Sequence, residues 1–163
     1  MGNIYFNNSS NFILYTKIIE KYEENMMYDP VMVQPMRDEL TNIGIQELLT
    51  PEDVDGFFGN KTGTYFLIIN SVCGCAAGGA RPGLTLALKN EKKPDRVVTV
   101  FAGMEKEAAQ QARSHFSELP PSSPSMVLMK DGQVVHFVPR HMIEGRGPEL
   151  VAEDLIKAFD EYC

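Results

Sequence analysis

The chain has 163 residues and a formal net charge of −7, and 44% of its residues are hydrophobic. This length fits one compact domain with room for a short extension, and the composition is typical of a folded globular protein. The acidic balance argues against a surface that neutralises phosphates, so nucleic acid is not expected as a partner. Three cysteines are too few for a disulfide scaffold, and we expect a cytoplasmic protein with mostly reduced thiols.

Residues 1–25 are expected to form a poorly ordered N-terminal extension, and residues 26–163 to form a single domain. The extension has an Asn- and Ser-rich cluster at 7–11 and no basic residue before Lys17, so it resembles neither a secretory signal nor a transit peptide. No stretch of the chain approaches the run of about 18 apolar residues that a membrane span needs. We therefore expect no membrane association.

The first half of the domain predicts two helices followed by a buried strand. One buried helix face, ending at Gly44, is predicted by apolar residues at spacings of four and three, namely Met32, Met36, Leu40 and Ile43. Thr50 and Pro51 are typical of a helix start, and they open a second, short helix. The apolar run at 65–69 predicts a central strand that is covered on both faces.

The second half continues the alternation of helices and strands. The predicted elements are a helix at 76–89 that Pro82 and two glycines loosen, a buried strand at 96–101, a helix at 105–119, strands at 125–129 and 133–138, and a closing amphipathic helix around 151–162. Asp131-Gly132 between two apolar runs is a strong hairpin signal. The order predicts an α/β fold whose mixed sheet has two parallel strands and a C-terminal antiparallel hairpin.

Cys73-Gly74-Cys75 lies where the central strand gives way to a helix, a position at which α/β sheets carry functional loops. Unpaired backbone N–H groups and the positive end of the helix dipole favour a thiolate there, which raises thiol reactivity at neutral pH. Residues two apart can approach the roughly 4.4 to 6.8 Å Cα separation of a disulfide. Such a small ring is expected to be strained and labile, and Gly74 has the backbone freedom to accommodate it.

Three other interpretations of this region compete with the redox one. The cysteines could be inert core residues, because free cysteine is often buried. A metal site is not expected, since the remaining candidate ligands lack the paired spacing of a zinc ribbon. The neighbouring glycines do not match a phosphate-binding motif in register, so Gly78 and Gly79 are interpreted as packing or close-approach residues.

Pro124 marks a second segment that we expect at the same place. It precedes the strand at 125–129, where proline does not remove a ladder hydrogen bond. That strand should lie beside the strand that leads to Cys73, so Pro124 would face the cysteine loop. A cis Ser123-Pro124 bond would shape a substrate groove there, although an average X-Pro bond is trans.

Several separated motifs together resemble one family, the bacilliredoxins. They are the segments at 70–78, 80–82, 99–103, 121–126, 136–141 and 143–145, which include the Cys-Gly-Cys motif, Pro124 and the sequence His-Phe-Val-Pro-Arg-His. The resemblance covers about residues 26–163 and leaves out residues 1–25. It implies a thioredoxin-like three-layer sandwich.

The resemblance also implies a bacterial cytoplasmic enzyme that removes bacillithiol from mixed disulfides on protein cysteines. Cys73 would be the nucleophile, Cys75 the second redox cysteine, and Cys163 a possible resolving thiol. No cofactor would be bound; bacillithiol would serve as the exchanging small thiol, and a separate reductase system would regenerate it. The partners would be S-bacillithiolated client proteins.

The candidates for the substrate groove are Gly74, Pro124 and two arginines. Arg81 and Arg140 could pair with the carboxylates of the small thiol, because guanidinium groups bind carboxylates well. The alternative for both is an ordinary structural or surface charge. Two other functions also remain open: a general disulfide isomerase or oxidase with a strained Cys-Gly-Cys disulfide, and a non-catalytic thiol- or metal-binding module.

Overall fold

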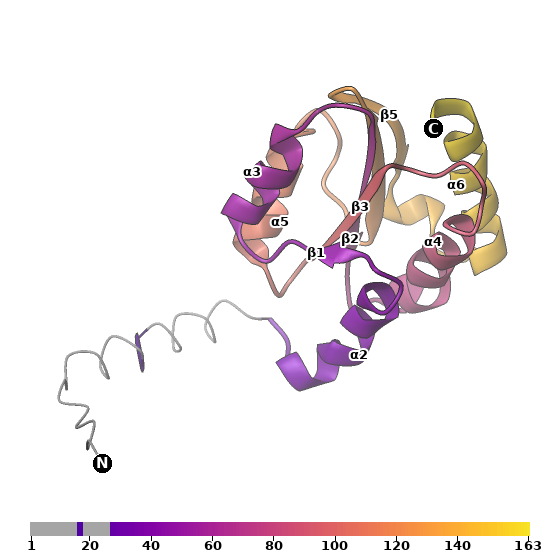
Figure 1. Ribbon diagram of the computed structural model, residues 1–163. Helices are drawn as coiled ribbons and strands as arrows, with labels where there is room; N and C mark the ends of the chain where they lie inside the picture. The colour runs from indigo at the N-terminus through magenta and orange to yellow at the C-terminus, as the bar shows by residue number, and fades with distance from the viewer. Residues whose placement is uncertain (1–15, 18–26) are drawn as a thin grey trace, which may run out of the picture.

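The computed structural model describes residues 16–17 and 27–163 (Figure 1), so the predicted extension lies almost wholly outside the described residues. The helices are α2 (Pro30–Thr41), α3 (Pro51–Gly59), α4 (Arg81–Ala87), α5 (Lys106–Ser114) and α6 (Pro148–Tyr162), with a π-helical stretch at Ala76–Ala80 and a 3-10 turn at Arg140–Met142. The strands are β1 (Gln46–Glu47), β2 (Thr64–Asn70), β3 (Arg96–Phe101), β4 (Ser125–Lys130) and β5 (Gln133–Val138). Among the described residues, no helix has the length and apolar character to cross a membrane.

The five strands form one mixed sheet in the order β1-β3-β2-β4-β5. β2 and β3 are parallel, whereas β4 is antiparallel to both β2 and β5. This confirms the predicted parallel pair and the C-terminal hairpin. The structure adds a third parallel strand, β1, whose two residues give too short a pattern for sequence periodicity to detect.

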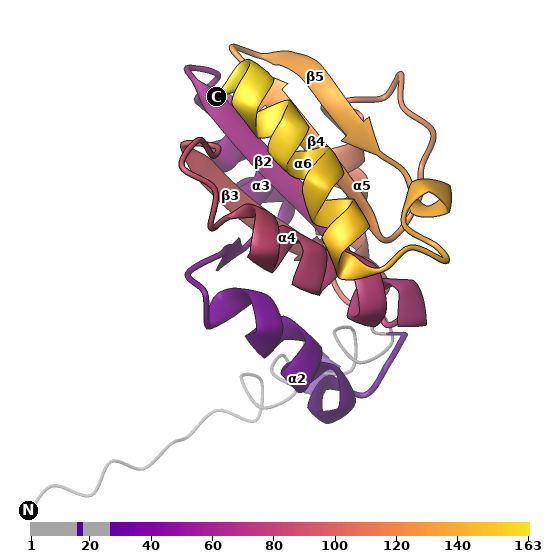
Figure 2. The same ribbon diagram turned by 90° about the vertical axis from the view of Figure 1, so that its right-hand side faces the viewer.

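The central position of β2 organises the core. All seven of its residues are buried, and their side chains alternate between the two faces of the sheet. Phe66 and Ile68 belong to the core beneath α4 and α6, while Leu67 and Ile69 belong to the core beneath α3 and α5. The helices therefore cover the sheet on both sides, as the two views show (Figures 1 and 2). This arrangement confirms a three-layer α/β sandwich.

Two helix predictions are corrected by the structure. Met32 and Ile43 are 47% and 42% exposed, and the buried residues of α2 are Val33 and Leu40. α2 lies beside α4 (Figure 2) and buries few of its side chains. The spacing of its apolar residues therefore did not predict which side of the helix faces the core. The helix predicted over 105–119 ends at Ser114, although its apolar residues, among them Ala112, are buried as expected.

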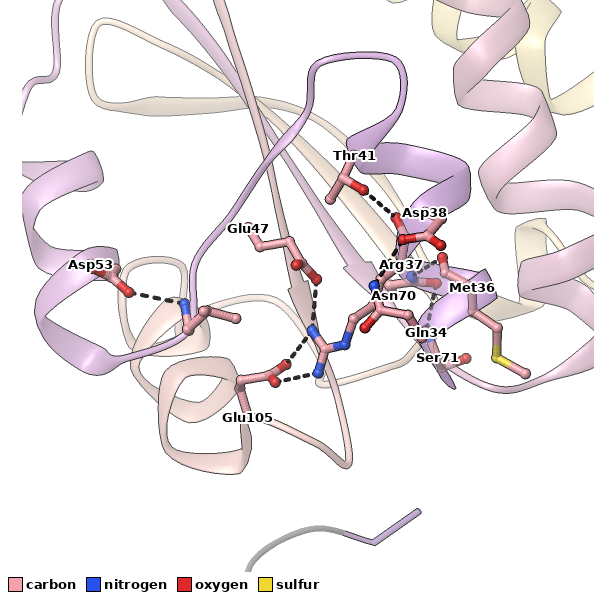
Figure 3. Close-up of polar contacts among 11 residues, drawn as sticks. Gln34, Met36, Arg37, Asp38, Thr41, Glu47, Asp53, Asn70, Ser71 and Glu105 are labelled. Atoms are coloured by element: carbon pink, nitrogen blue, oxygen red, sulfur yellow. Dashed lines mark hydrogen bonds and ion pairs between the residues drawn. The ribbon is translucent and has the colours of Figure 1, made fainter. Parts of the chain in front are cut away.

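A cationic side chain ties α2 to the rest of the domain (Figure 3). Arg37 donates from Nη1 to Glu47 of β1 at 2.6 Å and from Nη2 to Glu105, just before α5, at 2.5 Å. Its guanidinium also lies 5.2 Å from the ring centroid of Phe101. Burial raises the pKa of Glu105 although Arg37 opposes this shift. One arginine of α2 thus forms ion pairs with two glutamates, one in β1 and one just before α5.

The contact between α4 and α6 depends on a glycine. A Cβ atom added to Gly83 would lie 2.8 Å from side-chain atoms of Val151 and 3.1 Å from the carbonyl oxygen of Pro148. Gly83 is therefore the residue that lets these two helices pack closely against one face of the sheet.

We predict that Gly83→Ala lowers the free energy of unfolding by about 1 to 3 kcal/mol, because the added methyl group overpacks a close helix contact. Gly78→Ala is the matched control, since a Cβ added at Gly78 meets no atom within 4 Å. The control should leave stability unchanged or raise it by up to about 1 kcal/mol. Urea denaturation measures both variants, and equal effects would contradict the close-approach role of Gly83.

Candidate active site

Cys73 and Cys75 form a disulfide in the loop between β2 and the π-helical stretch, with their Cα atoms 5.3 Å apart. Cα atoms at this separation are typical of disulfides, as the sequence spacing predicted. Gly74 between them is exposed, and a Cβ added there would meet no atom within 4 Å. The backbone of Gly74 has no positive φ, so the structure shows no steric need for glycine in this ring.

The two sulfurs have different surroundings. The backbone N–H of Cys75 donates to Sγ of Cys73 at 3.2 Å, and the backbone N–H of Cys73 donates to Oγ of Ser71 at 3.3 Å. A donor aimed at Sγ stabilises the negative charge of a thiolate. Cys75 packs partly buried against the core between α4 and α6, where apolar surroundings favour a neutral thiol. The geometry therefore favours Cys73 as the nucleophile.

Asn70, the last residue of β2, fixes the start of the cysteine loop (Figure 3). Its side chain is buried and hydrogen-bonded at both ends: Oδ1 accepts from the backbone N–H of Ser71 at 2.9 Å, and Nδ2 donates to the carbonyl of Met36 in α2 at 3.2 Å. Buried amide groups are costly unless paired, so this arrangement allows little alternative geometry. The strand end, α2 and the residue two before Cys73 are thereby joined.

Arg81 completes this network from the start of α4. Its side chain is 2% exposed, and Nη1 donates to Oδ1 of Asn70 and to the carbonyl of Ser71, both at 3.1 Å. Its Nε and Nη2 donate to the two carboxylate oxygens of Glu39 at 2.7 and 3.2 Å. The side chain predicted to line a substrate groove thus faces protein groups beneath the cysteine loop. The hydrogen bonds of the Arg81 guanidinium go to protein groups, so its role in substrate binding stays a prediction.

Pro124 lies at the end of the sheet from which the cysteine loop leaves. β4 runs antiparallel to β2, and Ser125 pairs with Ile69, one residue before Asn70. This register confirms the expected proximity of the two segments. The Ser123-Pro124 peptide bond is cis.

Arg140 links the Pro124 segment to Glu144, a residue that the sequence analysis did not single out as a site residue. Its backbone N–H donates to Oγ of Ser122, and its Nη1 contacts the carbonyl of Ser123 at 3.5 Å. Its Nε pairs at 2.5 Å with Glu144, and both side chains are about half exposed. A carboxylate oxygen of Glu144 lies within 4.8 Å of the sulfurs of both cysteines.

Another glycine allows the Glu144 segment to lie this close to the cysteine loop. A Cβ added to Gly79 would lie 3.0 Å from Cγ2 of Ile143 and 3.3 Å from the carbonyl oxygen of Arg146. Gly79 thus confirms the predicted close approach, whereas Gly78 faces open space. Glu144 follows Gly79 by 65 positions in the sequence. Only the packing of the folded chain therefore reveals that its segment lies beside the cysteine loop.

Cys163 lies far from the redox pair. Lys130, which pairs with Thr64 at the start of β2, donates from Nζ to the carbonyl of Tyr162, the residue before Cys163, whereas Cys73 follows the other end of β2. Seven strand residues span about 20 Å at about 3.3 Å per residue. Partial burial raises the pKa of Cys163, which disfavours the thiolate. Within one chain, this placement gives no support to Cys163 as a resolving thiol for Cys73.

Cys73, Cys75 and Glu144 are also the set of side chains that comes nearest to a metal site in the described part of the chain. In the disulfide state neither sulfur has a thiolate to offer to a metal. Three ligands also fall short of the four that close a structural zinc site. The arrangement is therefore better matched to exchange chemistry at sulfur than to metal binding.

Comparison with known proteins places this site in context. A family model described as disulphide isomerase matches residues 28–163. A bacilliredoxin of Geobacillus kaustophilus is 54% identical over 143 residues, covering 85% of this chain and 99% of the relative. A bacilliredoxin of Cytophaga hutchinsonii is 50% identical over 135 residues, covering 83% and 99%.

Solved structures agree on the fold. Mitochondrial thioredoxin 3 of Saccharomyces cerevisiae, in its oxidised form, aligns with a TM-score of 0.51 at 19% identity, covering 76% of this chain and 98% of that one. A structure described as an oxidoreductase with a thioredoxin fold gives a TM-score of 0.53 at 13% identity, covering 70% of this chain and 92% of that one. At these identities the likeness establishes a thioredoxin-like fold.

We predict that Arg81→Met lowers the free energy of unfolding by about 2 to 4 kcal/mol, because it removes charged hydrogen bonds from buried acceptors. Glu39→Gln is the comparison variant: it keeps the inner bonds of Arg81, and Glu39 is 46% exposed, so the loss should be about 1 kcal/mol or less. Urea denaturation of the oxidised proteins measures both. If Arg81→Met costs no more than Glu39→Gln, the inner contacts do not stabilise the loop.

Proposed function

The chain belongs to the bacilliredoxin family and is a thiol-disulfide oxidoreductase, and from this premise we propose that it removes bacillithiol from S-bacillithiolated cysteines of client proteins. The observation that carries the assignment of its nucleophile is the hydrogen bond from the backbone N–H of Cys75 to Sγ of Cys73. In the disulfide form this donor already points at Sγ of Cys73, so we expect it to stabilise the thiolate that reduction releases there.

In the proposed reaction the Cys73 thiolate attacks the bacillithiol sulfur of the mixed disulfide. A bond forms between Cys73 and bacillithiol, and the client cysteine leaves as a thiolate that takes up a proton. Either Cys75 or a second bacillithiol then attacks the mixed disulfide on Cys73. The first route ends in the Cys73–Cys75 disulfide and a separate reductase system must reduce it; the second ends in bacillithiol disulfide.

Bacillithiol is proposed as the small thiol on two lines of support, namely the names of the relatives and an arginine that can receive the carboxylate of a small anionic thiol. The relatives are named bacilliredoxins and match this chain over nearly their whole length. At the site, the half-exposed guanidinium of Arg140 lies between the Pro124 segment and Glu144, where it can meet a carboxylate of the small thiol. Bacillithiol is thus an exchanging substrate of the proposed reaction and no bound cofactor is required. The proposed setting is the bacterial cytoplasm.

We predict different outcomes for the two cysteine variants. Cys73→Ser should abolish removal of bacillithiol, because it removes the attacking sulfur. Cys75→Ser should still accept bacillithiol and accumulate as a Cys73 mixed disulfide, which intact-mass spectrometry detects as one added bacillithiol. Both variants are made with Cys163→Ser so that the terminal thiol cannot contribute. Turnover by the Cys73→Ser variant would show that the nucleophile is misassigned.

Substrate competition tests the specificity. One client protein is prepared with bacillithiol or with glutathione on the same cysteine, and a scrambled-disulfide protein is offered in parallel. We expect a kcat/KM for the bacillithiolated client at least about tenfold above that for the glutathionylated client, which corresponds to about 1.4 kcal/mol of additional transition-state stabilisation. Equal rates on all three substrates would instead indicate a general disulfide isomerase or oxidase.

A further inference from the structure

The 139–147 segment, which follows β5, holds the side chain of Glu144 in a defined place. Ile143 is fully buried in the core between the sheet and α6. Arg146 donates to the carbonyl of Met142 at 3.0 Å and pairs with Asp154 of α6 at 2.5 Å. The segment is therefore anchored on both sides of Glu144. The position of this carboxylate beside the cysteines is a consequence of packing, although the side chain itself is half exposed.

The two thiols differ in how readily each can lose its proton. Cys73 has a backbone donor at its sulfur, so its thiolate is supported without another group. In the part of the chain that the structure describes, no hydrogen-bond donor contacts Sγ of Cys75, which packs against apolar core residues. Apolar surroundings favour a neutral thiol over a thiolate, and a thiol must lose its proton to attack a disulfide. The second step therefore needs a proton acceptor.

We propose that Glu144 is the proton acceptor for Cys75 when Cys75 resolves the mixed disulfide on Cys73. The groups that the structure places against Glu144 are Arg140 from its own segment and the two cysteines from the loop after β2. An oxygen-to-sulfur separation of up to 4.8 Å is the span that a single bridging water covers. This inference rests on the proposed function, because it concerns the second step of that reaction.

The step balances as follows. The proton of Cys75 passes through the water to the Glu144 carboxylate, and the Cys75 sulfur bonds to the Cys73 sulfur. The bond between Cys73 and the small thiol breaks, and the small thiol leaves with that electron pair. It takes up one proton, which returns Glu144 to its carboxylate form. Over the two steps together the cysteine pair is oxidised by two electrons, and the mixed disulfide of client and small thiol is reduced by two electrons to two thiols.

Dithiodipyridine tests this step without bacillithiol. It is a neutral disulfide, so the charge of Glu144 does not steer its arrival. The reduced protein, in a Cys163→Ser background, releases one thiopyridone when Cys73 attacks and a second when Cys75 resolves the adduct. Stopped-flow absorbance separates the two phases. We expect Glu144→Gln to slow the second phase at least about tenfold at neutral pH and not to slow the first phase, because removing a negative charge near Sγ of Cys73 favours its thiolate.

Two variants and a pH profile make the result decisive. Glu144→Asp keeps a carboxylate and should resolve faster than Glu144→Gln. Glu91→Gln removes the same charge at an exposed site outside the cysteine region and should match the parent protein. The deficit of Glu144→Gln should shrink at alkaline pH, where hydroxide replaces the acceptor. Equal second phases in Glu144→Gln and Glu91→Gln at all pH values, a faster second phase in Glu144→Gln, or no gain from Glu144→Asp would overturn the proposal.

The proton acceptor and the proposed substrate can be refuted separately. A normal Glu144-dependent second phase with no activity on bacillithiolated clients would refute the substrate and leave the proton acceptor intact. Activity on bacillithiolated clients with a second phase that is indifferent to Glu144 would refute the proton acceptor alone.

Discussion

The buried hydrogen-bond network of Asn70 and Arg81 is the interaction on which the cysteine site depends. β2 is paired on both edges and buried on both faces, so its end has little freedom to shift. Asn70 then joins that end to α2 and to Ser71, while Arg81 reaches the same amide from the helix that follows the cysteines. Both ends of the redox loop are thus tied to one buried polar cluster. Because unpaired polar groups are costly there, the loop has one well-defined starting geometry.

On this frame, separate segments bring different groups to the cysteine site. The loop after β2 provides both sulfurs and the backbone donor, the turn before β4 provides Pro124, and the segment after β5 provides Arg140 and Glu144. Two cysteines only two residues apart consequently meet different surroundings, one with a hydrogen-bond donor at its sulfur and one packed against the core. A difference of this kind suits a pair in which one sulfur attacks first and the other follows.

Local signals in the sequence were reliable for the elements of the core. The strand predicted at 96–101 has the bounds of β3, and Asp131-Gly132 forms the turn between β4 and β5. Each follows from a short run of residues whose period or turn chemistry is sufficient in itself. Burial predicted from residue type alone was wrong at two positions. Met32 is apolar yet exposed, because α2 buries only a narrow stripe, and Arg81 is charged yet buried, because Glu39, Asn70 and Ser71 satisfy its donors.

The sequence by itself determined the reactive pair, its place at the end of the central strand and the class of chemistry, because all three depend on residues that are neighbours in the chain. The tertiary structure decided which charged groups meet that pair. It brought Glu144 to the cysteines through the close approach at Gly79, turned Arg81 inward and left Cys163 at the far end of β2. Such contacts join residues far apart in the chain, and strand register and helix packing fix them, so no local pattern carries them.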